Sequence, residues 1–210
     1  MSGKLSAEYA GKKKAIDERL EDFRGVWSGG DKRIFSELCF CICTPQSKAV
    51  HCDAAVSRLA ETGALFKGTL PQVRAGLKGV RFPNNKARYI LECRRLFTKD
   101  GRIRIKDKID PRNVEAARRW LVRNVKGLGL KEASHFLRNI GLGSGLAILD
   151  VHIMRNMKRL GIIDEIPKCL TEKCYLAMEQ KLRRFAGRVR IPMDALDLLF
   201  WSRETGMIFK

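Results

Sequence analysis

The stretch VKGLGLK, residues 125–131, decides how this chain folds. Two glycines one position apart, Gly127 and Gly129, favour a tight turn because glycine adopts backbone conformations that other residues avoid. Helical patterns before and after the turn predict a helix-hairpin-helix motif, with Lys131 in the first turn of the second helix. The N–H groups at such a helix start are free to bind a phosphate, so the motif predicts a nucleic-acid contact.

The composition favours a polyanionic partner. The 210 residues include 42 Lys and Arg against 23 Asp and Glu, a formal net charge of +19. Cations that contact phosphates release condensed counterions on binding, which favours nucleic acid; a solvated basic surface without a partner is the alternative. The sequence has no apolar run of about 18 residues and no apolar core typical of a secretory signal near its start. We therefore expect no membrane association and a cytoplasmic location.

The seven cysteines predict neither disulfides nor a metal site. Their odd number and the missing export signal favour reduced thiols. Cys39, Cys41 and Cys43 lie in an apolar run and are expected in the core. Cys169 and Cys174 form only a pair, whereas an iron–sulfur cluster needs four close thiolates. The sequence thus predicts no metal ligands.

Helical patterns dominate the chain and predict an all-α fold. The only strand-like alternation, at 102–106, is brief and is expected to be a loop edge. Asp110-Pro111 is typical of a helix start, with Asp as the N-cap and Pro at the first helical position. The expected helices span residues 32–42, 47–61, 71–79, 84–97, 110–126, 130–140, 151–160, 171–185 and 192–203.

Lys131 and Asp150 are the candidate catalytic residues. A cation in the first turn opposes the helix dipole, so a purely structural lysine is disfavoured at position 131. A lysine amine freed of its proton is a nucleophile for electrophilic carbon. Asp150 stands where it can cap the helix that begins at Val151. A simple capping role is the alternative for Asp150, although a capping carboxylate is also rigidly aimed.

These motifs resemble a known family. Gly127–Lys131 followed by Asp150-Val151-His152 is similar to the helix-hairpin-helix DNA glycosylases with the Gly/Pro…Asp signature. The segment 197–206, DLLFWSRETG, and the last residue, Lys210, resemble the small archaeal-type 8-oxoguanine DNA glycosylases, the second Ogg subfamily. The resemblance implies two helical lobes with the active-site cleft between them. Residues 30–146 would form a six-helix lobe ending in the hairpin motif, and 1–29 with 147–210 the second lobe.

The resemblance implies a bifunctional glycosylase and AP lyase that removes 8-oxoguanine and uses no cofactor. Lys131 would attack the sugar C1′ of a flipped nucleotide and form a Schiff base, from which β-elimination breaks the DNA strand. Asp150 would stabilise positive charge on the sugar and help to deprotonate the amine. Two alternatives stay open: the same chemistry on oxidised pyrimidines, and a non-catalytic helix-hairpin-helix DNA-binding module.

The resemblance also implies a base pocket. The counterpart of His135 packs on the flipped base, Trp201 would stack on it, and the terminal carboxylate of Lys210 would accept the N7 hydrogen that distinguishes 8-oxoguanine from guanine. Phe82 is a candidate stacking or wedge residue. Core packing is the alternative for Trp201 and Phe82, and a surface or core position for His135. Asp194 and Asp197 share a helix, and either could bond the guanine edge.

The remaining candidates concern the DNA duplex. Gly127 and Gly129 would present N–H groups to a phosphate, and His152 would contact another. Gln46 would fill the gap left by the flipped nucleotide; an ordinary helix-start glutamine is the alternative. A monovalent cation could bridge the hairpin carbonyls and a DNA phosphate. We expect a monomer that binds double-stranded DNA containing oxidised guanine and is associated with the nucleoid through that binding.

Overall fold

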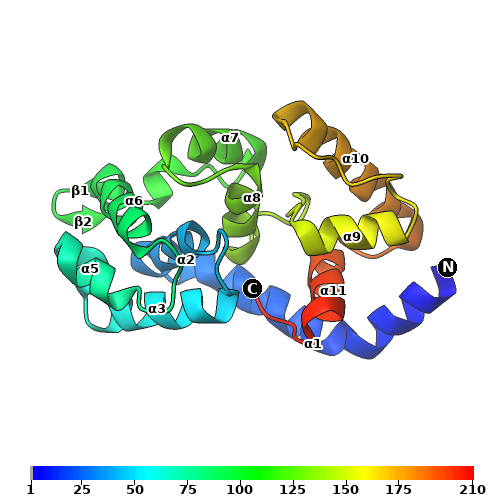
Figure 1. The fold of residues 1–210 in the computed structure, drawn as a ribbon, viewed down its shortest axis with the longest axis horizontal. Coiled ribbons are helices and arrows are strands. Elements are labelled where there is room, and N and C mark those ends of the chain that lie inside the picture. Colours follow the sequence, from blue (N-terminus) through cyan, green and yellow to red (C-terminus); the bar gives the residue numbers. More distant parts are fainter. Residues whose placement is uncertain (1) are drawn as a thin grey trace.

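The structure, a computed structural model, describes residues 2–210 and confirms the all-α fold. Within that range it has eleven α-helices and one two-stranded antiparallel hairpin, in which Thr98 pairs with Ile103 (Figure 1). The elements are α1 (Ser2–Ser28), α2 (Asp31–Cys43), α3 (Ala49–Glu61), α4 (Ala64–Lys67), α5 (Leu70–Gly76), α6 (Pro83–Phe97), β1 (Thr98–Lys99), β2 (Arg102–Ile103), a 3₁₀ turn (Lys106–Lys108), α7 (Val114–Asn124), α8 (Leu130–Asn139), α9 (Val151–Arg159), α10 (Glu172–Val189) and α11 (Met193–Thr205).

The buried side chains form two hydrophobic clusters. One draws its members from Val26 to Leu146, and the other from two segments, Leu5 to Phe23 and Ala147 to Phe200. Figure 1 shows the corresponding halves side by side, with α2 to α8 in one, α9 to α11 in the other, and α1 running beneath both. This distribution supports the two predicted lobes, whose boundaries stay a prediction.

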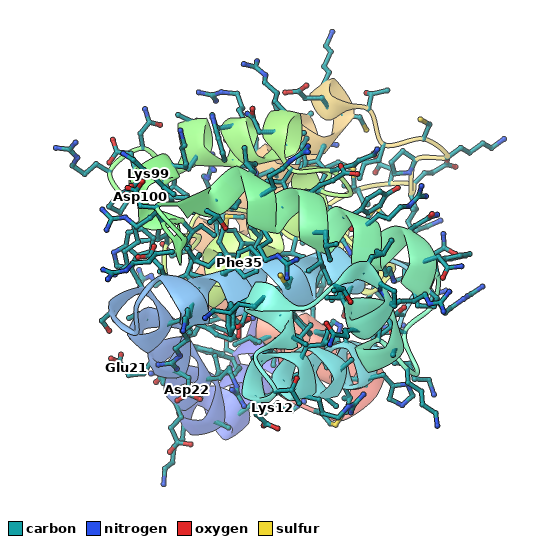
Figure 2. The ribbon with its side chains drawn as sticks, turned by 90° about the vertical axis from the view of Figure 1, so that its left-hand side faces the viewer. Lys12, Glu21, Asp22, Phe35, Lys99 and Asp100 are labelled. Atoms are coloured by element: carbon teal, nitrogen blue, oxygen red, sulfur yellow. The ribbon has the colours of Figure 1, made fainter. Side chains whose placement is uncertain are left out.

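The first cluster contains Phe35 and the cysteines of α2. In Figure 2 Phe35 lies inside the molecule, whereas Lys99, Asp100 and Glu21 extend from the surface. Phe35 is completely buried, as are the three cysteines of the apolar run in α2. Burial in apolar surroundings raises the pKa of the Cys39 and Cys41 thiols, so these groups act as small apolar side chains.

A buried ion pair joins the two halves next to the segment that carries Asp150. Glu179 on α10 accepts hydrogen bonds from Arg118 on α7, at 2.6 and 3.0 Å. The same carboxylate accepts from the backbone N–H of Ala147 at 2.8 Å. The connection between α8 and α9 is therefore fixed at Ala147.

Four expectations about the elements were incomplete or wrong. The 27-residue helix α1 was not predicted, and the alternation at 102–106 belongs partly to a strand. Residues 30–146 contain seven α-helices rather than six, because the four-residue α4 was missed. Helix α7 begins at Val114, not near Asp110.

The late start of α7 has a local cause. The Asp110 carboxylate accepts a hydrogen bond from the backbone N–H of Arg112, two residues later, which closes a turn instead of capping a helix. Asn113 is the N-cap, since its side chain accepts from the backbone N–H of Ala116 at 3.1 Å.

No helix among residues 2–210 is both long and apolar enough to cross a membrane.

Candidate active site

The hairpin between α7 and α8 requires glycine at position 127. Gly127 has φ +89°, and a Cβ there would lie 2.6 Å from the Tyr89 ring. Leu128 is buried and anchors the turn, and Gly129 is the N-cap of α8. The turn thus leaves Gly127 and Gly129 exposed where α8 begins, and the binding of a phosphate by their N–H groups stays a prediction.

A cleft of about 820 Å³ opens beside α8 and brings most of the predicted site residues together. Its lining comes from both halves of the molecule: from the loop after α2, from α3, α8 and α9, and from α11 with the segment after it. The predicted residues that line it are Lys131, Asp150, His135, Asp197, Trp201, Lys210, His152 and Gln46.

Lys131 and Asp150 enter the cleft from the first turns of two helices. The Lys131 side chain is 26% exposed, and its Nζ lies 3.0 Å from Oε1 of Glu132. The other oxygen of Glu132 accepts a hydrogen bond from the backbone N–H of Gly129 at 3.2 Å. Asp150 is the N-cap of α9, with Oδ1 accepting from Ile153 N at 2.8 Å. One carboxylate therefore holds the amine near the hairpin, while the other is fixed by the helix it caps.

His135 and Arg138 form the inner wall of the cleft, one and two helical turns beyond Lys131 on the same face of α8. Burial lowers the pKa of His135 well below its ordinary value, and the cations Arg138, Lys131 and Lys210 lower it further, so the imidazole is neutral. The ring lies edge-on to Phe40, and its Nε2 has no hydrogen-bond partner within residues 2–210. A neutral, unpartnered nitrogen can bond to a ligand in the cleft.

Arg138 pairs with Asp197 at the base of the cleft. Arg138 Nη2 lies 3.3 Å from Asp197 Oδ2, and both residues are buried. Burial raises the pKa of Asp197 to about 7; Arg138 opposes this shift, while Asp150 and Asp194 add to it. Sequence reasoning missed Arg138, although its position seven residues after Lys131 on one helix face was a signal that could have found it.

Lys210 reaches the cleft on the segment that returns from α11 toward α2 and α3 (Figure 1). Its Nζ lies 2.7 Å from Glu37 Oε1 and 2.6 Å from Asp53 Oδ1, and 4.9 Å from the centre of the Phe40 ring. Glu37 also accepts a hydrogen bond from Asn139 at 3.1 Å. Both acids were missed, because their contacts with Lys210 join residues far apart in the sequence.

Two short loops form the rim of the cleft. Gln46 lines it from the loop between α2 and α3, with φ +57°, and Arg81 lines it from the loop before α6. Phe82 is half exposed, with φ +56°, and its ring lies 5.4 Å from the Arg81 guanidinium carbon. His152 lines the cleft with Nδ1 3.9 Å from Glu204. Sequence reasoning did not select Arg81.

Four predicted residues lie outside the lining: Phe82, which adjoins the rim, the hairpin glycines Gly127 and Gly129, and Asp194. Asp194 is buried near the start of α11, and its Oδ1 accepts a hydrogen bond from Ala195 N. Of the two aspartates on α11, Asp197 is therefore the one that faces the cleft. In the described part of the chain, no three His, Cys, Asp or Glu side chains are grouped so that they could hold a metal ion.

A model of the 8-oxoguanine DNA glycosylase family matches residues 16–191. The chain belongs to this family. It is 47% identical over 195 residues to a protein of Fusobacterium nucleatum named 8-oxoguanine DNA glycosylase/AP lyase, covering 92% of this chain and 90% of that protein. A protein of the same name from Methanocaldococcus jannaschii is 39% identical and covers 94% of this chain and 93% of its own length.

Solved structures of 8-oxoguanine DNA glycosylases share the fold. The Thermotoga maritima enzyme superposes with a TM-score of 0.86 at 35% identity, covering all of this chain and 98% of that one. The Methanocaldococcus jannaschii glycosylase/lyase in complex with a 15mer DNA containing 8-oxoguanine gives 0.85 at 36% identity, covering 94% and 93%. The archaeal-type family predicted from residues 125–131 and 197–210 is confirmed.

Proposed function

We propose that the protein removes 8-oxoguanine from double-stranded DNA and then cleaves the resulting abasic site, as a base-excision repair enzyme. One observation carries this proposal: Lys131 and Asp150 line a single cleft in a chain that matches glycosylase/lyase relatives over nearly their whole length. A DNA-binding module would need the hairpin but no enclosed amine and carboxylate. The cleft therefore favours the enzyme over the non-catalytic alternative.

Lys131 supplies the nucleophile in this proposal. Its uncharged amine attacks C1′ of the extruded nucleotide, the bond from C1′ to the base breaks, and the base leaves with the electron pair and is protonated. Asp150, aimed by the helix it caps, stabilises the positive charge that develops on the sugar and takes a proton from the amine. Ring opening gives an imine between Lys131 and C1′. Loss of a C2′ proton then expels the 3′ phosphate, which is the lyase step.

The inner wall provides a base pocket of suitable chemistry. Trp201 offers an aromatic face, while neutral His135 and buried Asp197 offer hydrogen-bonding groups. 8-Oxoguanine carries a hydrogen on N7 where guanine carries a lone pair, so a fixed acceptor favours the lesion and leaves guanine unpaired. Lys210, held by Glu37 and Asp53, is proposed to present that acceptor.

DNA binding is assigned to the hairpin and the rim. The N–H groups near Gly127 and Gly129 and the side chain of His152 are proposed to contact phosphates, with Gln46 and Phe82 next to the extruded nucleotide. A monovalent cation at the hairpin carbonyls belongs to the same proposal, as do a monomeric state and a cytoplasmic location on DNA. The net charge of +19 supports binding to the phosphate backbone.

Borohydride trapping tests the enzyme directly. Borohydride reduces the imine to a stable amine, so the protein incubated with 8-oxoguanine duplex should migrate as a covalent adduct. Lys131→Gln should give no adduct, while Lys126→Gln, a change in a hairpin lysine outside the cleft lining, should keep it. Base release from duplexes carrying 8-oxoguanine or an oxidised pyrimidine decides between the two lesion classes. An adduct that persists in Lys131→Gln would refute the assignment.

A further inference from the structure

A second lysine amine lies under the rim of the cleft, on α6. Lys86 is only 4% exposed, and its Nζ donates to Cys43 O at 2.6 Å, Pro45 O at 2.8 Å and Ser47 Oγ at 3.0 Å. All three acceptors are uncharged. Burial lowers the pKa of the Lys86 amine, because the amine is removed from water and no carboxylate of residues 2–210 lies beside it to stabilise its charge.

The three acceptors place Lys86 at the end of α2. Cys43 is the last residue of α2, so its carbonyl has no partner within the helix. A cation at this position satisfies the carbonyl and is favoured by the helix dipole. The amine then continues to Pro45 and Ser47, the residues on either side of Gln46. Gln46 itself has φ +57°, a conformation that residues other than glycine rarely adopt unless their surroundings hold them.

Ser47 connects this loop to the second rim loop. Its hydroxyl oxygen accepts a hydrogen bond from the backbone N–H of Arg81 at 2.9 Å, as well as the one from Lys86. Phe82 follows with φ +56°, and its carbonyl accepts from the backbone N–H of Lys86 at 3.1 Å, the first bond of α6. Ser47 thus links the Lys86 amine to both rim loops, whereas the bond to Phe82 comes from the backbone and does not depend on the Lys86 side chain.

We propose that Lys86 is a positioning residue that fixes the two rim loops before DNA binds, so that Gln46 and the Arg81–Phe82 pair are already shaped to enter the duplex. This inference rests on the proposed function. Extruding a nucleotide costs unstacking and unpairing, and side chains that fill the gap offset this cost only if they need little ordering themselves. Lys86 touches no reacting atom. It acts through the geometry of the rim.

The test compares Lys86→Met with a matched control on the same helix. Arg94, a half-buried cation, likewise bonds to backbone carbonyls, Gly68 O at 2.8 Å and Ala64 O at 3.4 Å, but it does not line the cleft. Arg94→Met therefore removes a similar set of bonds far from the rim. Ser47→Ala is the milder variant: it removes the bond from Arg81 N–H and one of the three bonds of the Lys86 amine.

Three readouts separate positioning from general damage: single-turnover release of 8-oxoguanine from duplex DNA, fluorescence of 2-aminopurine beside the lesion as a measure of base extrusion, and borohydride trapping on an abasic site in single-stranded DNA. Lys86→Met should lower duplex release and extrusion by about tenfold. Trapping on the single strand should stay within about twofold of wild type, since no base has to leave a stack. Arg94→Met should change all three by less than about twofold.

Ser47→Ala should show the same pattern as Lys86→Met at about threefold, and it decides the question if Lys86→Met does not fold. Equal losses on duplex and single strand, or no loss on the duplex, would overturn the inference. A wild-type protein that neither releases 8-oxoguanine nor forms an adduct would instead overturn the proposed function, so the two failures are distinguishable.

Discussion

Lys131 lines the cleft and Lys86 lies beneath its rim, and the surroundings of their amines differ. The Lys131 side chain is 26% exposed, opens into the cavity and has the carboxylate of Glu132 at 3.0 Å. The Lys86 amine is closed off from solvent and donates to three uncharged oxygens. An amine can react only where a substrate carbon can reach it and where a nearby base can take its proton. The access of a substrate carbon to the amine therefore distinguishes Lys131, the proposed nucleophile, from Lys86.

Removing the charge of Asp150, which lines the same cleft as Lys131, should have the largest effect. Asp150→Asn keeps a side-chain oxygen for the cap of α9 but removes the charge that the proposed mechanism uses. We expect the single-turnover rate of 8-oxoguanine release to fall by about a thousandfold with little change in DNA affinity. Gel-shift titration and base-release kinetics measure the two quantities. Unchanged kinetics would contradict a catalytic role for Asp150 and leave only its role as a cap.

Asp197, at the base of the same cleft, should make the stability of the protein depend on pH. Its folded-state pKa of about 7 lies above the ordinary value of 3.8, so the folded protein holds this proton more tightly than the unfolded chain. The contribution of Asp197 to the free energy of unfolding should therefore decrease as pH rises from about 4 to about 7, by at most about 4 kcal/mol. Asp197→Asn should gain stability relative to wild type between pH 5 and pH 8.

Guanidinium chloride unfolding at the two pH values measures the effect of Asp197. Asp22→Asn, a change in an exposed carboxylate paired with Arg19, is the control and should show the same difference from wild type at both pH values. A pH-independent difference for Asp197→Asn would mean that Asp197 ionises as an ordinary surface carboxylate does.

Replacing Lys86 should lower the stability of the protein more than replacing Lys131, whereas replacing Lys131 should lower the activity more. Lys86→Met removes three hydrogen bonds, to the oxygens of Cys43, Pro45 and Ser47, so we expect the free energy of unfolding to fall by about 2 kcal/mol. Lys131→Met removes only the contact with Glu132, beside a partly exposed amine, and should change it by less than about 0.5 kcal/mol. Chemical denaturation of the two variants gives the values. Equal losses of unfolding free energy in the two variants would mean that the Lys86 amine stabilises the fold no more than the Lys131 amine does.

The smallest effect concerns Lys210. Glu37→Gln combined with Asp53→Asn removes both charges that hold its Nζ. We expect 8-oxoguanine release to fall by about threefold, while trapping on a preformed abasic site stays unchanged because no base has to be recognised there. Equal losses on both substrates would argue against a role of Lys210 in base recognition.

Local patterns predicted what depends on neighbours in the chain. Residues 125–131 identified the hairpin, because a left-handed glycine and a capped helix are local features, and the stripe of α2 identified its buried face. The long helix α1 escaped prediction because its apolar positions, such as Leu5 and Ile16, are widely spaced and face a second cluster built from the other end of the chain.

Lys86, Glu37 and Asp53 were missed because their partners are distant in sequence. Lys86 bonds to Cys43, which lies 43 positions earlier in the chain, and Glu37 bonds to Lys210, which lies 173 positions later. Nothing local marks a lysine that will be buried under a loop, since most lysines are solvated. Arg138 differs, because helical spacing from Lys131 placed it on the cleft face in advance. The sequence thus predicted Lys131 as the candidate nucleophile, whereas the contacts of Lys86 beneath the rim appear only in the folded structure.

Peptide mapping of the borohydride-trapped complex tests the central claim most directly. After nuclease and protease digestion, mass spectrometry locates the lysine that carries the reduced sugar fragment. The account predicts that the fragment lies on Lys131 alone, with the Lys86 peptide unmodified. A fragment on Lys86 or on any other lysine, with Lys131 unmodified, would contradict it.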